Sequence, residues 1–141
     1  MESSTLRPSV RSVTILFAVA VAVSLVHYLD NTINYADYPA PASDSALAPV
    51  APSQLLVGLS WFAFTGAGLW GLSALRRGRD RRAAVGLALY SGSGLVGFLH
   101  YAVPGALDMP WWRHAHVVAD IACGLAIFAV ALTVATRPGR A

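Results

Sequence analysis

The stretch Arg76-Arg77-Gly78-Arg79-Asp80-Arg81-Arg82 places five arginines between two long apolar segments. An arginine at the centre of a bilayer costs about 2.5–3.5 kcal/mol on membrane-insertion scales, so this stretch must lie in water. Short loops rich in arginine lie on the cytoplasmic side of cell membranes. The stretch therefore predicts a cytoplasmic loop between two membrane-spanning helices, and it fixes the side on which every other segment lies.

The composition is that of a membrane protein. Of the 141 residues, 56% are hydrophobic and only 12% are charged, whereas a typical soluble domain has about 25% charged residues. The net charge of +3 comes from arginines in short tracts beside apolar segments. A nucleic acid would need an extended polar surface around these arginines to contact its phosphate backbone. The sequence has no such surface, so we expect no nucleic-acid partner. The single cysteine, Cys123, rules out an intrachain disulfide.

Four apolar segments are each long enough to cross most of a hydrocarbon core about 30 Å thick as helices that rise about 1.5 Å per residue. We predict one all-α membrane domain over residues 1–141. Its expected elements are helices at 12–30, 55–75, 83–101 and 113–135, outer loops at 31–54 and 102–112, and an inner basic loop at 76–82. A cleaved signal peptide is the competing interpretation of the first helix, but no clear small-residue cleavage site ends that segment.

The distribution of arginines agrees with this layout. Of the ten arginines, only Arg113 falls on the outer side. An even number of spans then leaves both termini in the cytoplasm. We therefore expect an antiparallel four-helix transmembrane bundle, integral to the cell membrane and surrounded by the lipid bilayer.

Two further features concern the surfaces of this bundle. Residues 31–54 contain four prolines, which exclude a continuous helix, so this segment is either a lid or a plain connecting loop. Ala63, Ala67 and Gly71 recur every four positions on the second helix. Such a small-residue face permits close helix approach, and we expect it to be a surface for a homo-oligomer.

Candidate functional residues gather at the outer helix ends. On the first helix His27 shares a face with Asp30 and Asn31, and on the fourth helix His116 shares a face with Asp120. Asp120 lies about one turn deeper than His116, and an ionisable group at that depth is a functional-site hypothesis by default. All four histidines belong to this outer zone: His27, His100, His114 and His116.

Three imidazoles with carboxylates suit a divalent transition metal such as Zn, Fe, Mn or Cu. We predict His27, His100 and His116 as ligands. Asp120 is a fourth ligand or orients His116, and Asp30 plays the same supporting part for His27. Asp30 and Asp120 are also the candidates for proton transfer. Four neighbours are expected to support the site: Tyr28, Asn31, Tyr101 and His114, the last pointing away from His116 around the helix.

The spacing matches no specific metal motif, so several functions stay open. One is a transition-metal site of a membrane-embedded enzyme that acts on a lipid or another apolar substrate through metal-polarised water. The alternative is a non-catalytic accessory subunit, or a cation or proton carrier protomer, in which the His/Asp residues are structural or titrate protons. The sequence does not decide whether the protein is an enzyme.

Overall fold

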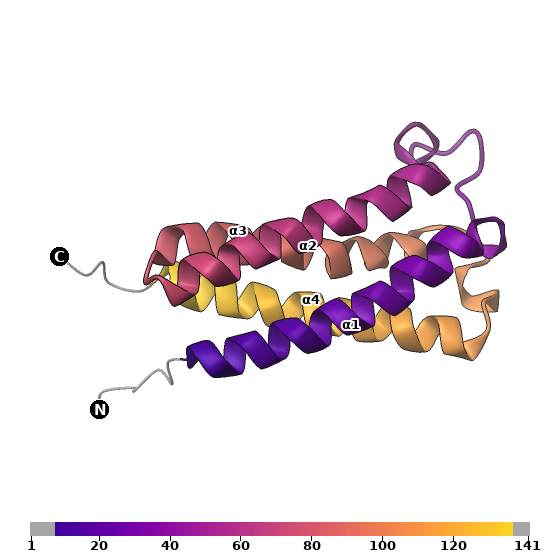
Figure 1. The fold of residues 1–141 in the computed structure, drawn as a ribbon. Helices are drawn as coiled ribbons and strands as arrows, with labels where there is room; N and C mark the ends of the chain where they lie inside the picture. The colour runs from indigo at the N-terminus through magenta and orange to yellow at the C-terminus, as the bar shows by residue number, and fades with distance from the viewer. Residues whose placement is uncertain (1–7, 137–141) are drawn as a thin grey trace, which may run out of the picture.

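The computed structural model describes residues 8–136, and this part of the chain is helical, with no strand. Its long helices are α1 (Val10–Ile33), α2 (Gln54–Arg76), α3 (Asp80–Leu95) and α4 (Trp111–Ala135) (Figure 1). Four segments are long and apolar enough to cross a membrane, the third being α3 together with its continuation to Ala102. Arg7, Arg137 and Arg140, which contributed to the predicted topology, lie outside the described residues.

Short 3-10 helices complete the fold. They are η1 (Tyr35–Asp37), η2 (Ala48–Val50), η3 (Val96–Ala102) and η4 (Ala106–Asp108). The third span was expected to be one regular helix as far as residue 101, but it continues beyond Leu95 as the 3-10 helix η3. Since a 3-10 helix has 3.0 rather than 3.6 residues per turn, this change resets the direction of the side chains that follow, including His100.

The first helix is longer than predicted because both of its ends are capped. The Ser9 hydroxyl accepts a hydrogen bond from the Ser12 backbone N–H, and the Asn34 backbone N–H donates to the Asp30 carbonyl. A serine at the first cap satisfies an N–H that the helix leaves free. The helix therefore carries His27 and Asn31 in its regular part rather than in a loop.

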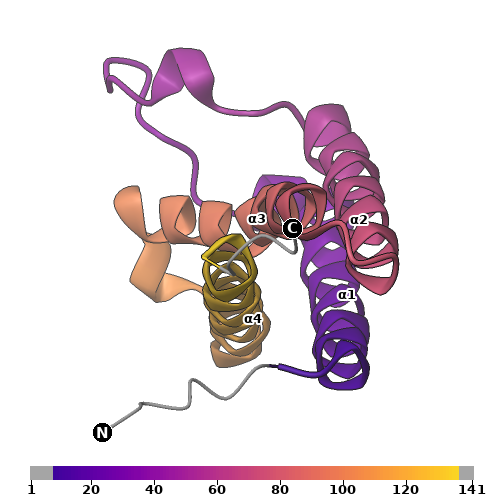
Figure 2. The same ribbon diagram turned by 90° about the vertical axis from the view of Figure 1, so that its left-hand side faces the viewer.

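The helices form one closed bundle. α1 packs against α2 and α4, and α3 packs against α2 and α4. The start of α1, the α2–α3 turn and the end of α4 lie at one end of the bundle, here called the arginine end (Figures 1 and 2). The opposite end, which holds His27, His100 and His116, is called the histidine end.

Glycines set the closest contacts between helices. An added Cβ at Gly86 would lie 2.5 Å from the Gly71 Cα and 2.7 Å from the Ala67 carbonyl oxygen, so α2 and α3 touch through their backbones. The small-residue face predicted for a homo-oligomer is thus used within the chain at Ala67 and Gly71, while Ala63 is exposed. A homo-oligomer through this face stays a prediction.

Candidate functional site at the histidine end

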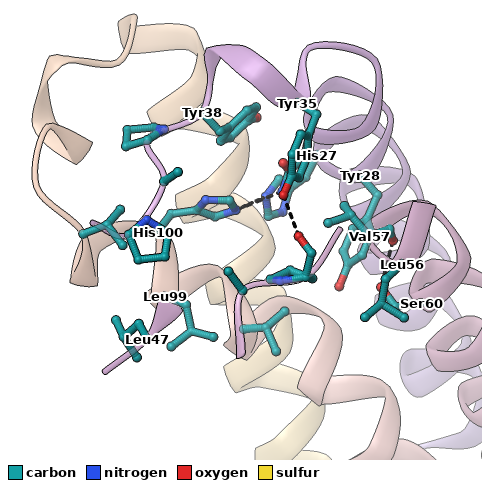
Figure 3. Close-up of a pocket in the computed structure, with 18 of the residues that line it drawn as sticks. His27, Tyr28, Tyr35, Tyr38, Leu47, Leu56, Val57, Ser60, Leu99 and His100 are labelled. Atoms are coloured by element: carbon teal, nitrogen blue, oxygen red, sulfur yellow. Dashed lines mark hydrogen bonds between the residues drawn. The ribbon is translucent and has the colours of Figure 1, made fainter. Parts of the chain in front are cut away.

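A chain of three polar side chains, two of them buried and His100 half-buried, joins three elements of the fold. The His27 Nδ1 from α1 lies 2.7 Å from the Asp120 Oδ2 of α4. The His27 Nε2 lies 3.3 Å from the His100 Nε2 of η3 (Figure 3). His27 and Asp120 are only 2% and 1% exposed, so the short distance between them marks a strong, charge-assisted contact. We call Asp120, His27 and His100 the Asp–His–His chain.

The helix patterns explain how this chain assembles. On α1 the buried side chains include Ser24, His27 and Asn31, which follow one another along one face. Asn31 extends the site because its Nδ2 lies 3.1 Å from the His100 Nε2. We predicted that His27 and His116 would each pair with an aspartate of its own helix, but His27 pairs with an aspartate of another helix. Asp120 orients His27 rather than His116.

A second network surrounds Asp30 and holds the connection between α1 and α2. Arg113, which is 5% exposed, donates from Nε to the Asp30 Oδ2 over 3.2 Å and from Nη2 to the Asp37 Oδ2 over 2.9 Å. The Tyr38 hydroxyl donates to the same Asp30 oxygen over 2.5 Å. Burial of Tyr38 and its hydrogen bond to the Asp30 carboxylate raise the pKa of its phenol, which stays protonated as the donor.

Asp30 therefore supports Arg113 and Tyr38, not His27 as predicted. The Asn34 Nδ2 donates to its other oxygen over 2.6 Å. The guanidinium of Arg113 also lies 4.9 Å from the ring centre of Tyr38 and 4.9 Å from that of Trp112. These contacts anchor the start of the connecting segment to α1 and α4.

His116 lies beside both networks without joining either by a hydrogen bond. Its ring centre is 5.5 Å from that of His27, and its Nε2 is 3.3 Å from the Asp30 Oδ2. This distance is that of an ion pair if His116 is protonated. Both ring nitrogens are buried, and neither has a hydrogen-bond partner within residues 8–136. His116 thus lies between Asp30 and the ring of His27.

The structure brings the three predicted histidine ligands together, since the ring centre of His27 lies 5.3 Å from that of His100 and 5.5 Å from that of His116. His27 and His100 face one another, His116 faces Asp30, and Asp120 contacts the far nitrogen of His27. In the part of the chain that the structure describes, no group of three or more His, Cys, Asp or Glu side chains is placed to hold a metal ion. A site for Zn, Fe, Mn or Cu therefore stays a prediction.

The remaining predicted residues, Tyr28, Tyr101 and His114, lie at the histidine end, and within residues 8–136 they form no hydrogen bond to the Asp–His–His chain. The Tyr101 hydroxyl lies 3.1 Å from the His114 Nδ1, and the two rings stack with centres 5.7 Å apart. His114 points away from His116, as the helix spacing predicted, and contacts neither His27 nor Asp120 by a hydrogen bond. Tyr28 lies beside His27 but donates to the Ser93 carbonyl oxygen over 3.1 Å.

A cavity of about 550 Å³ opens beside the Asp–His–His chain (Figure 3). His27, Asn31 and His100 contribute polar atoms, while α2 and η3 contribute mainly apolar side chains such as Leu56, Val57 and Leu99. Residues 35–52 of the connecting segment form another wall, with Tyr35, Tyr38 and Leu47 among the lining residues. This segment thus covers a cavity, and its movement as a lid stays a prediction.

Sequence reasoning missed Arg113, Asp37 and Tyr38 as parts of the site. An outer arginine that follows Trp111 and Trp112 is expected at the lipid headgroups, on an indole or beside Asp108, and of these the contact with the Trp112 indole is present. The available signal was its position as the one outer arginine, close to several carboxylates. A cation among so many acidic groups favours pairing, but the choice of Asp30 and Asp37 depends on how the connecting segment folds back.

Comparison of the chain with protein-family models, with curated proteins and with solved structures found no match. The chemistry of the site is therefore the guide to its role.

Proposed function

We propose that this chain is a multi-pass membrane protein that binds a lipid-soluble small molecule in the cavity at the histidine end. In this proposal the Asp–His–His chain supplies the polar wall of the cavity and exchanges a hydrogen bond or a proton with the ligand. One observation carries the proposal: a chain of polar groups from three elements runs from the buried Asp120 to a cavity that is otherwise mainly apolar. Cavities with a few convergent polar groups in an apolar lining are typical ligand sites.

Exposed apolar side chains support access from the bilayer. Leu56 on α2 and Val96 and Leu99 on η3 line the cavity and are also exposed on the surface of the bundle. In a membrane these positions face lipid, so a ligand dissolved in the bilayer reaches the cavity sideways between α2 and η3. Exposed apolar side chains at the entrance of the cavity would not favour the binding of a water-soluble ligand.

The alternative functions explain fewer of these contacts. A structural link between helices accounts for the His27–Asp120 contact, but not for His100 and Asn31 on the cavity wall. A carrier needs a polar route through the membrane. The core at the arginine end is instead built from apolar side chains such as Phe17, Leu87 and Ile127.

The ligand test uses a photoactivatable long-chain alcohol and the protein in lipid nanodiscs. Leu56→Trp, which places an indole at the cavity, is expected to reduce labelling of the cavity residues about tenfold, with labelled peptides quantified by mass spectrometry. Leu59→Trp on the same helix is the matched control, because Leu59 is as exposed as Leu56 (54% and 56%) but does not line the cavity. Equal labelling of both variants contradicts the proposal. A stoichiometric transition metal in the wild type, lost in both His27→Ala and His116→Ala, replaces it with the metal-site hypothesis.

We also propose that the bundle is antiparallel, with both termini and the arginine end in the cytoplasm. The support is the cluster of exposed arginines at that end and the positive-inside bias. The histidine end and its cavity then face the outside.

The orientation predicts which single cysteines react in intact cells. In a Cys123→Ala background, Asp44→Cys should be labelled by a membrane-impermeant thiol reagent and Arg77→Cys should not. Both positions are exposed. Gly78 is less suitable for the inner probe because its φ of 69° strains any side chain. The reverse pattern of labelling overturns the proposed orientation.

A further inference from the structure

We infer that the ligand of this cavity is uncharged and carries a hydroxyl or carbonyl oxygen that binds at His100 and Asn31. This inference rests on the proposed function and specifies the class of ligand. It follows from counting which donors, acceptors and charges remain free at the cavity wall.

The hydrogen bonds of the Asp–His–His chain leave a small polar site. As the atoms are placed, the Asn31 Nδ2 and the His27 Nε2 both approach the His100 Nε2. That nitrogen accepts from both if His27 is an imidazolium paired with Asp120 and His100 carries its proton on Nδ1. Across residues 8–136, no hydrogen bond engages the His100 Nδ1 or the Asn31 Oδ1. One donor and one acceptor are then free for a ligand.

The converse arrangement gives the same outcome. If His100 donates from Nε2 to His27 and the Asn31 amide is turned over, the His100 Nδ1 becomes an acceptor and the Asn31 amide becomes a donor. One donor and one acceptor again remain. A hydroxyl group matches such a pair fully, and a carbonyl oxygen matches the donor.

No charge is available to pair with a charged ligand. Among the described residues, no Asp, Glu or Arg lines the cavity. Arg113, the cation nearest in the fold, is buried between Asp30 and Asp37 and does not belong to the lining. The contact of His27 with Asp120 balances any charge on His27.

The hydroxyl groups of the lining already use their O–H donors within the protein. The Tyr35 hydroxyl donates to the Pro52 carbonyl oxygen, and the Ser60 hydroxyl donates to the Val57 carbonyl oxygen of its own helix. The hydroxyls of Tyr28 and Tyr38 donate to Ser93 and Asp30. A carboxylate, sulfonate or ammonium group in this cavity would lose its hydration without gaining a counter-ion, which is strongly unfavourable.

The test compares four probes with the same hydrocarbon chain: dodecanol, dodecane, dodecanesulfonate and dodecyltrimethylammonium. Each competes with the photoactivatable alcohol in nanodiscs, and its concentration is corrected for its measured partition into empty nanodiscs. Dodecanol should compete about five- to tenfold better than dodecane, because a net hydrogen bond contributes about 1 kcal/mol. It should compete at least about tenfold better than the two charged probes, because an unpaired charge is costly to bury. The two charged probes keep their charges at any working pH, so protonation does not blur the comparison.

Two variants at one position test the contact itself. His100→Phe keeps a ring but removes the polar atoms, and it should remove the advantage of dodecanol over dodecane. His100→Gln restores a donor and an acceptor and should recover part of that advantage. If either charged probe, or dodecane, competes as well as dodecanol in the wild type, the inferred ligand class is wrong although the cavity binds. If no probe competes, the proposed function fails as well.

Discussion

Replacing Asp120 with alanine is expected to destabilise the folded chain by about 3–5 kcal/mol, because the buried His27 then loses its charged partner. His27 and Asp120 lie 2.7 Å apart, and their side chains are each 2% exposed. Removing one of them leaves the other without its partner. Asp120→Asn keeps the shape and one hydrogen-bonding oxygen, so its effect should be about 1–3 kcal/mol. The measurement is chemical or thermal unfolding of the protein in one detergent.

A double-mutant cycle separates this contact from other effects of truncation. His27→Ala and Asp120→Ala together should cost less than the sum of the single variants, by about 1–3 kcal/mol, since the second change removes a group that the first left unpaired. His114→Ala with Asp120→Ala is the matched control, because His114 contacts Tyr101 and not Asp120. Additive effects in the His27 cycle mean that the two side chains do not stabilise one another.

The sequence predicted which faces of the helices carry the site, because spacing along a helix is periodic. His27 and Asn31 share the buried face of α1, and Asp120 is buried on α4. The partners across the helices were not predictable in the same way. Spacing says which side of a helix a residue occupies, but not how far the neighbouring helix is shifted along its axis. His27 therefore contacts Asp120 rather than Asp30, three positions along its own helix.

Two other differences from the prediction, the end of α3 and the position of Arg113, have local causes. The change from α-helix to η3 after Leu95 carries no strong signal in the sequence, yet it decides where His100 points. The position of Arg113 depends on a connecting segment that has no periodic pattern. Its buried place between Asp30 and Asp37 follows from how Tyr38 and the residues before it fold back. The three predicted histidine ligands do gather at one end of the bundle, with the rings of His100 and His116 both beside that of His27.

Replacing Gly94 with alanine is expected to disturb the site from outside it. An added Cβ at Gly94 would lie 2.2 Å from the Asp120 carbonyl oxygen and 3.1 Å from the Gly124 Cα. Both are backbone atoms, so neither can move aside as a side chain does. To reach ordinary contact, α3 and α4 must separate by roughly 1 Å, since favourable separations are about 3.5–4.0 Å between carbon atoms. That shift moves Asp120 away from His27.

The net effect combines two opposing terms. Overpacking of a close contact costs about 1–3 kcal/mol and sometimes more, while alanine favours a helix over glycine by up to about 1 kcal/mol. Because the clash here is with backbone, we expect a net loss of about 2 kcal/mol, together with weaker labelling of the cavity by the photoactivatable alcohol. Gly92→Ala on the same helix is the control. Its Cβ would meet only the Phe64 ring, at 3.2 Å, which can turn aside.

Gly92→Ala should therefore match or slightly exceed the wild type in thermal unfolding, because it keeps the helix-propensity gain without the clash. Its cavity labelling should fall less than that of Gly94→Ala, because only the ring of Phe64, a lining residue, has to turn. If Gly94→Ala unfolds at the wild-type temperature and labels normally, the backbones of α3 and α4 are not in contact at Asp120. The position of that carboxylate would then not depend on the glycine. If Gly94→Ala loses labelling but keeps its stability, the predicted loss of about 2 kcal/mol is wrong. The dependence of the cavity on the distance between α3 and α4 is then still supported.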